Sequence, residues 1–296
     1  MSQEPVSPEP VSPEPVSPEQ PSAQVTAPQT GAAPASAQQQ PGPNQPGPNQ
    51  PLPEQPVPEQ PAPPWIQPYI TYTLVTFLKL FARTFYRGEF SWVGDPLPNP
   101  WNDLRVVAIL NHTSLYEWLY AACVPQSFIR RLAWHGVVPV AEKTIQRPMV
   151  GQFFRMVAHH VVSITRKRDH TWEAVLQRLE GNTMVVMLPE GRMKRATGLD
   201  LHGNPMSIRG GIADVLNSLP EGRLLLAYSG GLHHIQHPGQ RLPNFFRTIR
   251  MNLEVVDIPT YRQQLLDEHG EAGFRKAVTR DLEHRRDQHC PPEIKP

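Results

Sequence analysis

The sequence predicts an α/β domain with a mixed, largely buried β-sheet flanked by helices, preceded by a disordered proline-rich tail. Short runs of almost continuous apolar residues recur along the chain, and segments with helical periodicity separate these runs. A strand that is apolar at consecutive positions is typical of a sheet covered by helices on both faces. The tail is set apart by its composition, which differs from that of the rest of the chain.

Residues 1–64 form this tail. They hold 20 of the 36 prolines, contain no Lys, Arg or aromatic residue, and repeat the motif EPVSP three times. Such a segment buries too little apolar surface to offset the entropy of ordering it. We therefore expect a disordered Pro/Gln/Glu-rich tail, which serves as a spacer or binds a protein module that recognises proline-rich peptides.

The remainder of the chain is moderately basic. Six of the 27 acidic residues and none of the 28 basic residues lie in the tail, which leaves a net charge of +7 for residues 65–296. This charge suits an anionic membrane surface, a phosphorylated substrate or nucleic acid. Two cysteines, Cys123 and Cys290, are too few for a disulfide framework, and neither a signal-peptide pattern nor an apolar run of about 18 residues is visible. We expect a cytoplasmic protein that is soluble or bound peripherally to a membrane.

Residues 65–88 are predicted to form an amphipathic membrane-interface helix. Apolar residues fall on one side of this helix, and three basic residues at i, i+4 and i+8 fall on the other. Aromatic and aliphatic side chains backed by a cationic stripe suit the plane of a membrane interface. The alternative is a helix that packs its apolar face on the core of the domain. The apolar residues are Ile70, Leu74, Phe77, Leu78, Phe81 and Phe85, and the basic ones are Lys79, Arg83 and Arg87.

Residues 89–296 are predicted to form the folded domain, in which strands and helices alternate and which closes with charged surface helices. Residues 127–143 stay unassigned because their pattern fits neither period alone. Strands are predicted for residues 89–94, 104–110, 159–166, 183–191, 223–231 and 249–259, and helices for a segment ending near 123 and for 147–157, 170–182, 207–219 and 259–289.

A histidine and a carboxylate lie five positions apart where strand 104–110 gives way to a helix. His112 and Glu117 converge if His112 lies in the turn and Glu117 in the first helical turn. Because histidine titrates near neutrality, the pair suits a general base and its orienting carboxylate. The segment from Ser114 to Glu117 also fits a capping box, in which Glu117 accepts a hydrogen bond from the Ser114 amide. The two interpretations are compatible, since a carboxylate has several acceptor sites.

Two later strands also end in charged residues. One runs into LPEGRMK, which places Glu190, Gly191 and Arg192 in a single turn, and the other ends at Arg166. Either cluster alone is typical of a solvated surface turn.

Together these segments resemble the sequence blocks of the glycerolipid (lysophosphatidic-acid) acyltransferase family. NHTSLYE resembles its NHx4D block, VVSITR resembles its second block, and LPEGRMK resembles its PEGTRS block. The order and approximate spacing agree from about Phe90 to Leu226. The chain departs from the family pattern by having Glu117 in place of Asp and Arg192 in place of Thr, and it lacks the late Val-Pro block.

The resemblance implies a fold like that of glycerol-3-phosphate acyltransferase. It also implies transfer of a fatty acyl group from acyl-CoA or an acyl-carrier protein to the hydroxyl of a lysophospholipid-like acceptor. His112 would act as general base and Glu117 would orient it, so that neither a protein nucleophile nor a metal or other cofactor is expected. Arginines would hold an acceptor phosphate, with Lys194 as a weaker candidate. The acceptor-binding residues implied are Asn111, Arg166, Glu190, Gly191 and Arg192.

Other classes of function compete with this one. A non-catalytic membrane-surface adaptor that works through its proline-rich tail fits the same sequence. Aromatic residues interleaved with bases in residues 77–87 suit single-stranded nucleic acid, but no continuous basic stripe accompanies them, so no nucleic-acid partner is expected. His233, His234 and His237 lack partners at ligand spacing, and a polar loop is expected there instead of a metal site.

Overall fold

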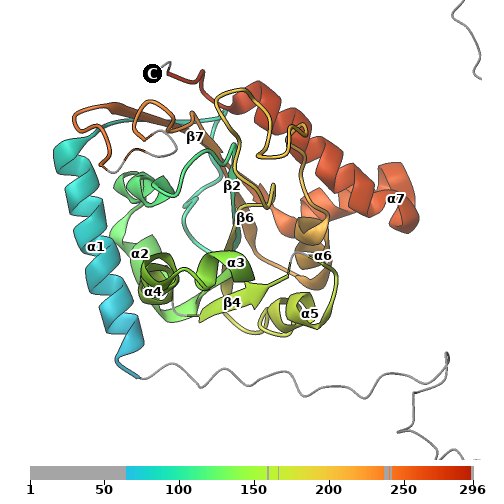
Figure 1. The fold of residues 1–296 in the computed structure, drawn as a ribbon. Coiled ribbons are helices and arrows are strands. Elements are labelled where there is room, and N and C mark those ends of the chain that lie inside the picture. Colours follow the sequence, from blue (N-terminus) through green and yellow to red (C-terminus); the bar gives the residue numbers. More distant parts are fainter. Residues whose placement is uncertain (1–64, 159, 166, 237–239, 241, 295–296) are drawn as a thin grey trace, which may run out of the picture. The chain divides into compact units, whose positions relative to one another are not determined.

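A computed structural model of the protein describes residues 65–158, 160–165, 167–236, 240 and 242–294 (Figure 1). These residues form a seven-stranded mixed sheet with helices on both faces, which confirms the predicted α/β class. The predicted disordered tail, residues 1–64, lies outside the described residues.

The sheet has the strand order β1-β7-β6-β2-β5-β3-β4. Strands β6, β2, β5, β3 and β4 are parallel to one another, whereas β7 is antiparallel to β6 and parallel to β1. The carboxyl ends of the five parallel strands therefore lie at one edge, where ligands bind in open α/β sheets. The strands are β1 (Arg87–Trp92), β2 (Leu104–Leu110), β3 (Gly136–Ala141), β4 (His160–Ile164), β5 (Met184–Met187), β6 (Arg223–Ser229) and β7 (Thr248–Asp257).

Helices cover both faces of the sheet (Figure 1). One face packs against α1, η1 and α2, and the other against α5, α6 and α7. Because side chains alternate along a strand, burial on both faces requires the apolar runs from which the strands were predicted. The helices are α1 (Gln67–Phe85), η1 (Glu117–Ala122, a 3₁₀ helix), α2 (Gln126–His135), α3 (Glu142–Ile145), α4 (Pro148–Val157), α5 (His170–Leu176), α6 (Gly211–Ser218) and α7 (Ile258–His289).

The segment left unassigned from sequence, residues 127–143, holds the rest of α2, all of β3 and the first residues of α3. Gly136 joins α2 directly to β3. A Cβ at this position would stand 2.3 Å from the carbonyl oxygen of Leu132, so only glycine allows so close an approach. Helix and strand thus meet without a polar loop. The helical spacing of apolar residues in α2 passes directly into the strand spacing of β3, which is why the sequence pattern fitted neither period alone. The predicted helix 170–182 also ends early, at Leu176.

The buried face of helix α1 only partly overlaps the apolar side expected from the sequence. Thr71, Val75 and Ala82 are buried against the domain. Phe81 and Phe85 are partly buried against the core, whereas Ile70 and Phe77 are exposed. The helix therefore packs on the core through small and β-branched residues, which allow close approach, and leaves larger apolar side chains on its outer face. It ends at Phe85 and not at residue 88, because Tyr86 is extended and β1 begins at Arg87.

Helix α7 is fixed to the sheet by a network of side chains that includes two buried tyrosines. Arg285 donates to Glu254 on β7 and to Asp281 on its own helix. Tyr228 at the end of β6 donates to the other oxygen of Glu254, and Tyr261 donates to Asp281. These bonds hold the last turns of α7 beside the carboxyl end of β6 and thereby position the residues that follow Arg285.

Candidate active site

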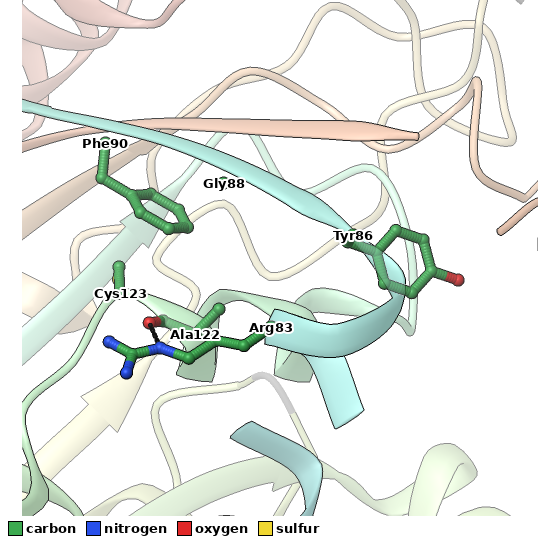
Figure 2. Close-up of a pocket in the computed structure, with 6 residues that line it drawn as sticks. All are labelled: Arg83, Tyr86, Gly88, Phe90, Ala122 and Cys123. Atoms are coloured by element: carbon green, nitrogen blue, oxygen red, sulfur yellow. Dashed lines mark hydrogen bonds between the residues drawn. The ribbon is translucent and has the colours of Figure 1, made fainter. Parts of the chain in front are cut away.

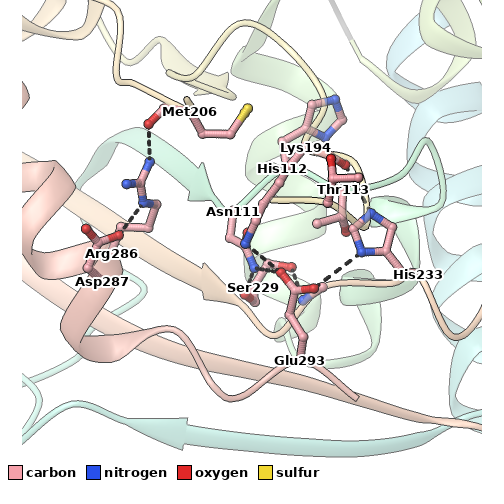
Figure 3. A network of polar contacts seen from close by, with 12 residues as sticks. Asn111, His112, Thr113, Lys194, Met206, Ser229, His233, Arg286, Asp287 and Glu293 are labelled. Carbon is pink, nitrogen blue, oxygen red and sulfur yellow. Dashed lines mark hydrogen bonds and ion pairs between the residues drawn. The ribbon is translucent and has the colours of Figure 1, made fainter. Parts of the chain in front are cut away.

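Residues from separate blocks of the sequence meet at the carboxyl edge of the parallel strands (Figure 3). Asn111 and His112 follow β2, Glu190 lies in the turn after β5, and Ser229 is the last residue of β6. Strands β5 and β6 both pair with β2. The topology therefore gathers these residues around the end of the central strand, as expected for an α/β ligand site.

His112 and Glu117 form a close pair. The distance between Nδ1 of His112 and Oε1 of Glu117 is 2.7 Å, and their side chains are 14% and 9% exposed. The carboxylate oxygen also accepts a hydrogen bond from the Thr113 amide at 3.1 Å. An ionised carboxylate only accepts hydrogen bonds, so Nδ1 is the donor in this contact and Nε2 is the nitrogen that can accept a substrate proton.

The predicted capping box is wrong. Glu117 bonds to the amide of Thr113 and not to that of Ser114, while the hydroxyl of Ser114 accepts from the Tyr116 amide. The physical reason is that the helix begins at Glu117 itself and is a 3₁₀ helix, so Glu117 is not the third helical residue that a capping box requires. The Glu117 carboxylate therefore contacts the ring of His112 and does not cap the helix.

Asn111 adopts the left-handed conformation, with φ at 65°. Asparagine tolerates this region better than most residues. The turn directs two successive amides at one carboxylate: the amide of Asn111 donates to Glu190 at 3.2 Å and that of His112 at 2.8 Å. The side-chain amide of Asn111 donates to the carbonyl of Ser229 at 2.9 Å. Glu190 and Ser229 together fix the backbone from which the His112 ring projects.

Glu190 is almost fully buried, at 1% exposure, and its charge is paired. The role in acceptor binding that the resemblance implies for Glu190 stays a prediction, and the structure pairs its carboxylate with Arg286 at 3.2 Å. Two amides and a guanidinium thus supply hydrogen-bond donors to this buried carboxylate. Its observed contacts are those of a residue that positions the turn of His112. Gly191, with φ at 64°, turns the chain directly after it, and the predicted contact of Gly191 with substrate stays a prediction.

Arg192 bonds within its own loop. Its guanidinium donates to Asp200 at 2.6 Å, to Ser207 at 2.8 Å and to the carbonyl of Pro205 at 3.0 Å. Hydrogen bonds from the amide of Asn204 and from Arg192 help to hold the pKa of Asp200 well below its usual range. A phosphate would have to replace one of these partners, so the role of Arg192 in acceptor binding stays a prediction. Arg166 lies outside the described residues.

Three charged or titratable side chains next to Asn111 complete the polar network. Lys194 donates to the side-chain oxygen of Asn111 at 3.2 Å and to Glu293 at 2.7 Å. His233 lies 3.3 Å from the other oxygen of Glu293 and 3.0 Å from the carbonyl of Lys194. Hydrogen bonds from His233 and Lys194 lower the pKa of Glu293 to about 2. Only Lys194 was a candidate from sequence.

The histidine-rich segment is not the polar loop expected from the sequence. His233 and His234 are buried, and His234 bonds to the carbonyl of Thr248 at 2.7 Å, whereas His237 lies outside the described residues. Both rings thus lie against backbone carbonyls, that of His233 against Lys194. No group of three or more His, Cys, Asp or Glu suited to a metal ion occurs in the part of the chain that the structure describes.

A separate pocket of about 290 Å³ lies where the end of α1, β1 and the end of η1 meet (Figure 2). None of its lining residues belongs to the predicted site. Burial raises the pKa of Cys123, in this pocket, and of Cys290 to about 12, so both thiols stay protonated at neutral pH and are poor nucleophiles. The lining residues are Arg83, Tyr86, Gly88, Phe90, Ala122 and Cys123.

Comparison with known proteins gives one family match. The model of the Acyltransferase family matches residues 94–226, a range that runs from the loop after β1 into β6 and includes His112, Glu117 and Glu190. A search of curated proteins found no match.

Proposed function

We propose that the protein transfers a fatty acyl group from acyl-CoA or an acyl-carrier protein to the hydroxyl of a lysophospholipid-like acceptor, because the Acyltransferase family model matches residues 94–226. The observation that supports this proposal most directly is the 2.7 Å contact between His112 and Glu117 inside the matched range. The same contact orients a base toward a hydroxyl in other acyl-transfer enzymes.

In the proposed reaction, Nε2 of His112 removes the proton of the acceptor hydroxyl as the oxygen attacks the thioester carbonyl. The new C–O bond forms, the C–S bond breaks, and the leaving thiolate takes the proton back from the imidazolium. Glu117 holds the Nδ1 proton and stabilises the imidazolium while it exists. The bonds from Glu190 to the amides of Asn111 and His112 keep the ring in place throughout.

Exchange of Glu117 for glutamine tests the role of its charge. A glutamine oxygen at the position of Oε1 still faces both Nδ1 of His112 and the Thr113 amide, but the negative charge that stabilises the imidazolium is lost. We expect the turnover rate to fall at least about tenfold with a nearly unchanged unfolding temperature. Full activity in this variant would show that Glu117 has no charge-dependent role.

We propose that the protein works on the cytoplasmic face of a membrane and binds it peripherally. No helix in the described ranges is long and apolar enough to cross a bilayer. Large apolar side chains are exposed on α1, and ring contacts of Phe81 and Phe85 with Phe245 bring the 242–246 loop beside the end of that helix. Such side chains insert into the interfacial region of a bilayer. The exposed residues are Trp65, Ile66, Tyr69, Ile70, Phe77 and Leu80, with Leu242, Phe245 and Phe246 from the loop.

The double variant Phe77→Ser, Leu80→Ser tests this surface. The two side chains are 61% and 64% exposed, so their loss leaves the core intact. We expect binding to vesicles of anionic phospholipid to weaken at least about tenfold in a sedimentation assay, because each side chain contributes on the order of 1 kcal/mol on insertion. Leu201→Ser, at a position that is 70% exposed in a loop remote in sequence from α1, is the matched control. Equal loss in the control, or none in the double variant, would contradict the assignment.

Acyl transfer itself is tested with a labelled acyl thioester and a panel of lysolipids. Release of free thiol only in the presence of an acceptor supports the proposal. Release without an acceptor indicates a thioesterase, and the absence of release indicates the non-catalytic adaptor.

A further inference from the structure

Glu293 follows the end of α7, and its carboxylate lies within a cluster of polar side chains. Figure 3 shows it directed between Asn111 and His233. It contacts Nζ of Lys194 at 2.7 Å, Nδ1 of His233 at 3.3 Å and Nδ2 of Asn111 at 3.4 Å. The side chain packs on Gly231, where an added Cβ would stand 3.1 Å from Cγ of Glu293. The cluster therefore encloses an anionic group from several sides.

Both ring nitrogens of His233 face hydrogen-bond acceptors. Nε2 faces the carbonyl oxygen of Lys194 at 3.0 Å and Nδ1 faces the carboxylate of Glu293, and both of these partners only accept hydrogen bonds. A neutral imidazole donates through one nitrogen alone, so the imidazolium is the form that donates in both contacts. With Lys194, the cluster presents an ammonium group and an imidazole ring to one carboxylate. A phosphate monoester, which carries almost two negative charges at neutral pH, matches this cluster better than a single carboxylate does.

The cluster is also coupled to the proposed base. Lys194 donates its amide to the carbonyl of His112 at 2.7 Å, and Asn111 precedes His112 in the chain. A phosphate held by Lys194 and His233 would thus be fixed beside the residue that accepts the substrate proton. By contrast, Arg192, which the resemblance implied as a phosphate ligand, has its guanidinium bonded to Asp200 and Ser207.

We propose that Lys194, His233 and Asn111 form the binding subsite for a substrate phosphate, and that the carboxylate of Glu293 occupies this subsite as an internal competitor when substrate is absent. The proposal rests on the proposed function in naming a substrate of that reaction. Binding of the phosphate displaces the Glu293 side chain from Lys194 and His233, and release of product lets it return. Glu293 therefore weakens substrate affinity without taking part in the chemistry.

Binding of inorganic phosphate tests the subsite without acyl transfer. Thermal unfolding of the full chain is followed against phosphate concentration, with chloride at matched ionic strength as reference, because a ligand that binds the folded state raises the unfolding temperature. In Glu293→Gln, half-maximal protection is expected at a phosphate concentration about fivefold or more below that of the wild type. Lys194→Gln alone should lose the protection, and adding it to Glu293→Gln should abolish the gain. Glu271→Gln, at an exposed position on α7, is the matched control.

An unchanged phosphate dependence in Glu293→Gln, or a gain that survives Lys194→Gln, would overturn the proposal. Kinetics then identify the source of the phosphate. If it belongs to the acceptor, Glu293→Gln lowers the KM for lysophosphatidate more than that for monoacylglycerol; if it belongs to the donor, it lowers the KM for acyl-CoA more than that for a phosphate-free acyl thioester. A protein that binds phosphate as expected but transfers no acyl group would contradict the proposed function and leave the subsite standing.

Discussion

The His112→Ala variant is expected to lose acyl transfer by a factor of about 10²–10⁴, the usual contribution of a general base. The physical reason is that an alcohol is a weak nucleophile until its proton is removed, and Nε2 of His112 is the nitrogen that the Glu117 contact makes basic. The measurement is the acceptor-dependent rate of thiol release from an acyl thioester.

Stability should change little in this variant. The bonds that hold the turn use the backbone amide of residue 112, which alanine keeps, and the imidazole is one-seventh exposed. His284→Ala, at an exposed position on α7, is the control for loss of a histidine as such. A rate within twofold of the wild type in His112→Ala would remove this residue from the mechanism, whatever the family match of the domain.

The fold could be predicted from sequence largely because the central strands are buried on both faces. Strands β2 and β6 are nearly uninterrupted apolar runs, which no surface helix would show. The prediction failed where Gly136 joins a helix to a strand with no turn residues between them. It also left open whether the apolar side of α1 meets the core or a membrane, since a hydrophobic pattern shows which residues are apolar but not which of two surfaces they meet.

Local spacing predicted only a contact between residues close together in the sequence, whereas the family resemblance also indicated Glu190, which is 79 positions from Asn111. His112 and Glu117 are five positions apart, and their contact follows from the turn between them. Arg286 is 96 positions from Glu190, and Glu293 is 182 positions from Asn111. Their contacts depend on how α7 packs against β6 and β7, and no local pattern encodes that packing. The sequence indicated only charged surface helices there.

Removing the side chain of Glu190 is expected to be the most destabilising single change at the site. In Glu190→Ala, the guanidinium of Arg286 and the amides of Asn111 and His112 lose a common acceptor in a buried place. Breaking a buried ion pair from one side costs about 3–5 kcal/mol in free energy of unfolding. For a domain of this size, that loss lowers the unfolding temperature by roughly 6–20 °C. Calorimetry or urea unfolding measures it, with the exposed Glu180→Ala as control.

A double-mutant cycle separates the energetic contribution of the Glu190–Arg286 ion pair from that of the hydrogen bonds between Glu190 and the backbone turn. Arg286→Met alone leaves the Glu190 carboxylate with its two amide donors, so it should destabilise the protein less than Glu190→Ala does. In the double variant no unpaired charge remains, and the loss should be smaller than the sum of the two single losses by about 1 kcal/mol or more. Additive losses would show that Arg286 and Glu190 are neighbours without energetic coupling. If Glu190→Ala keeps its stability but loses activity, the carboxylate acts on substrate and not through the backbone of His112.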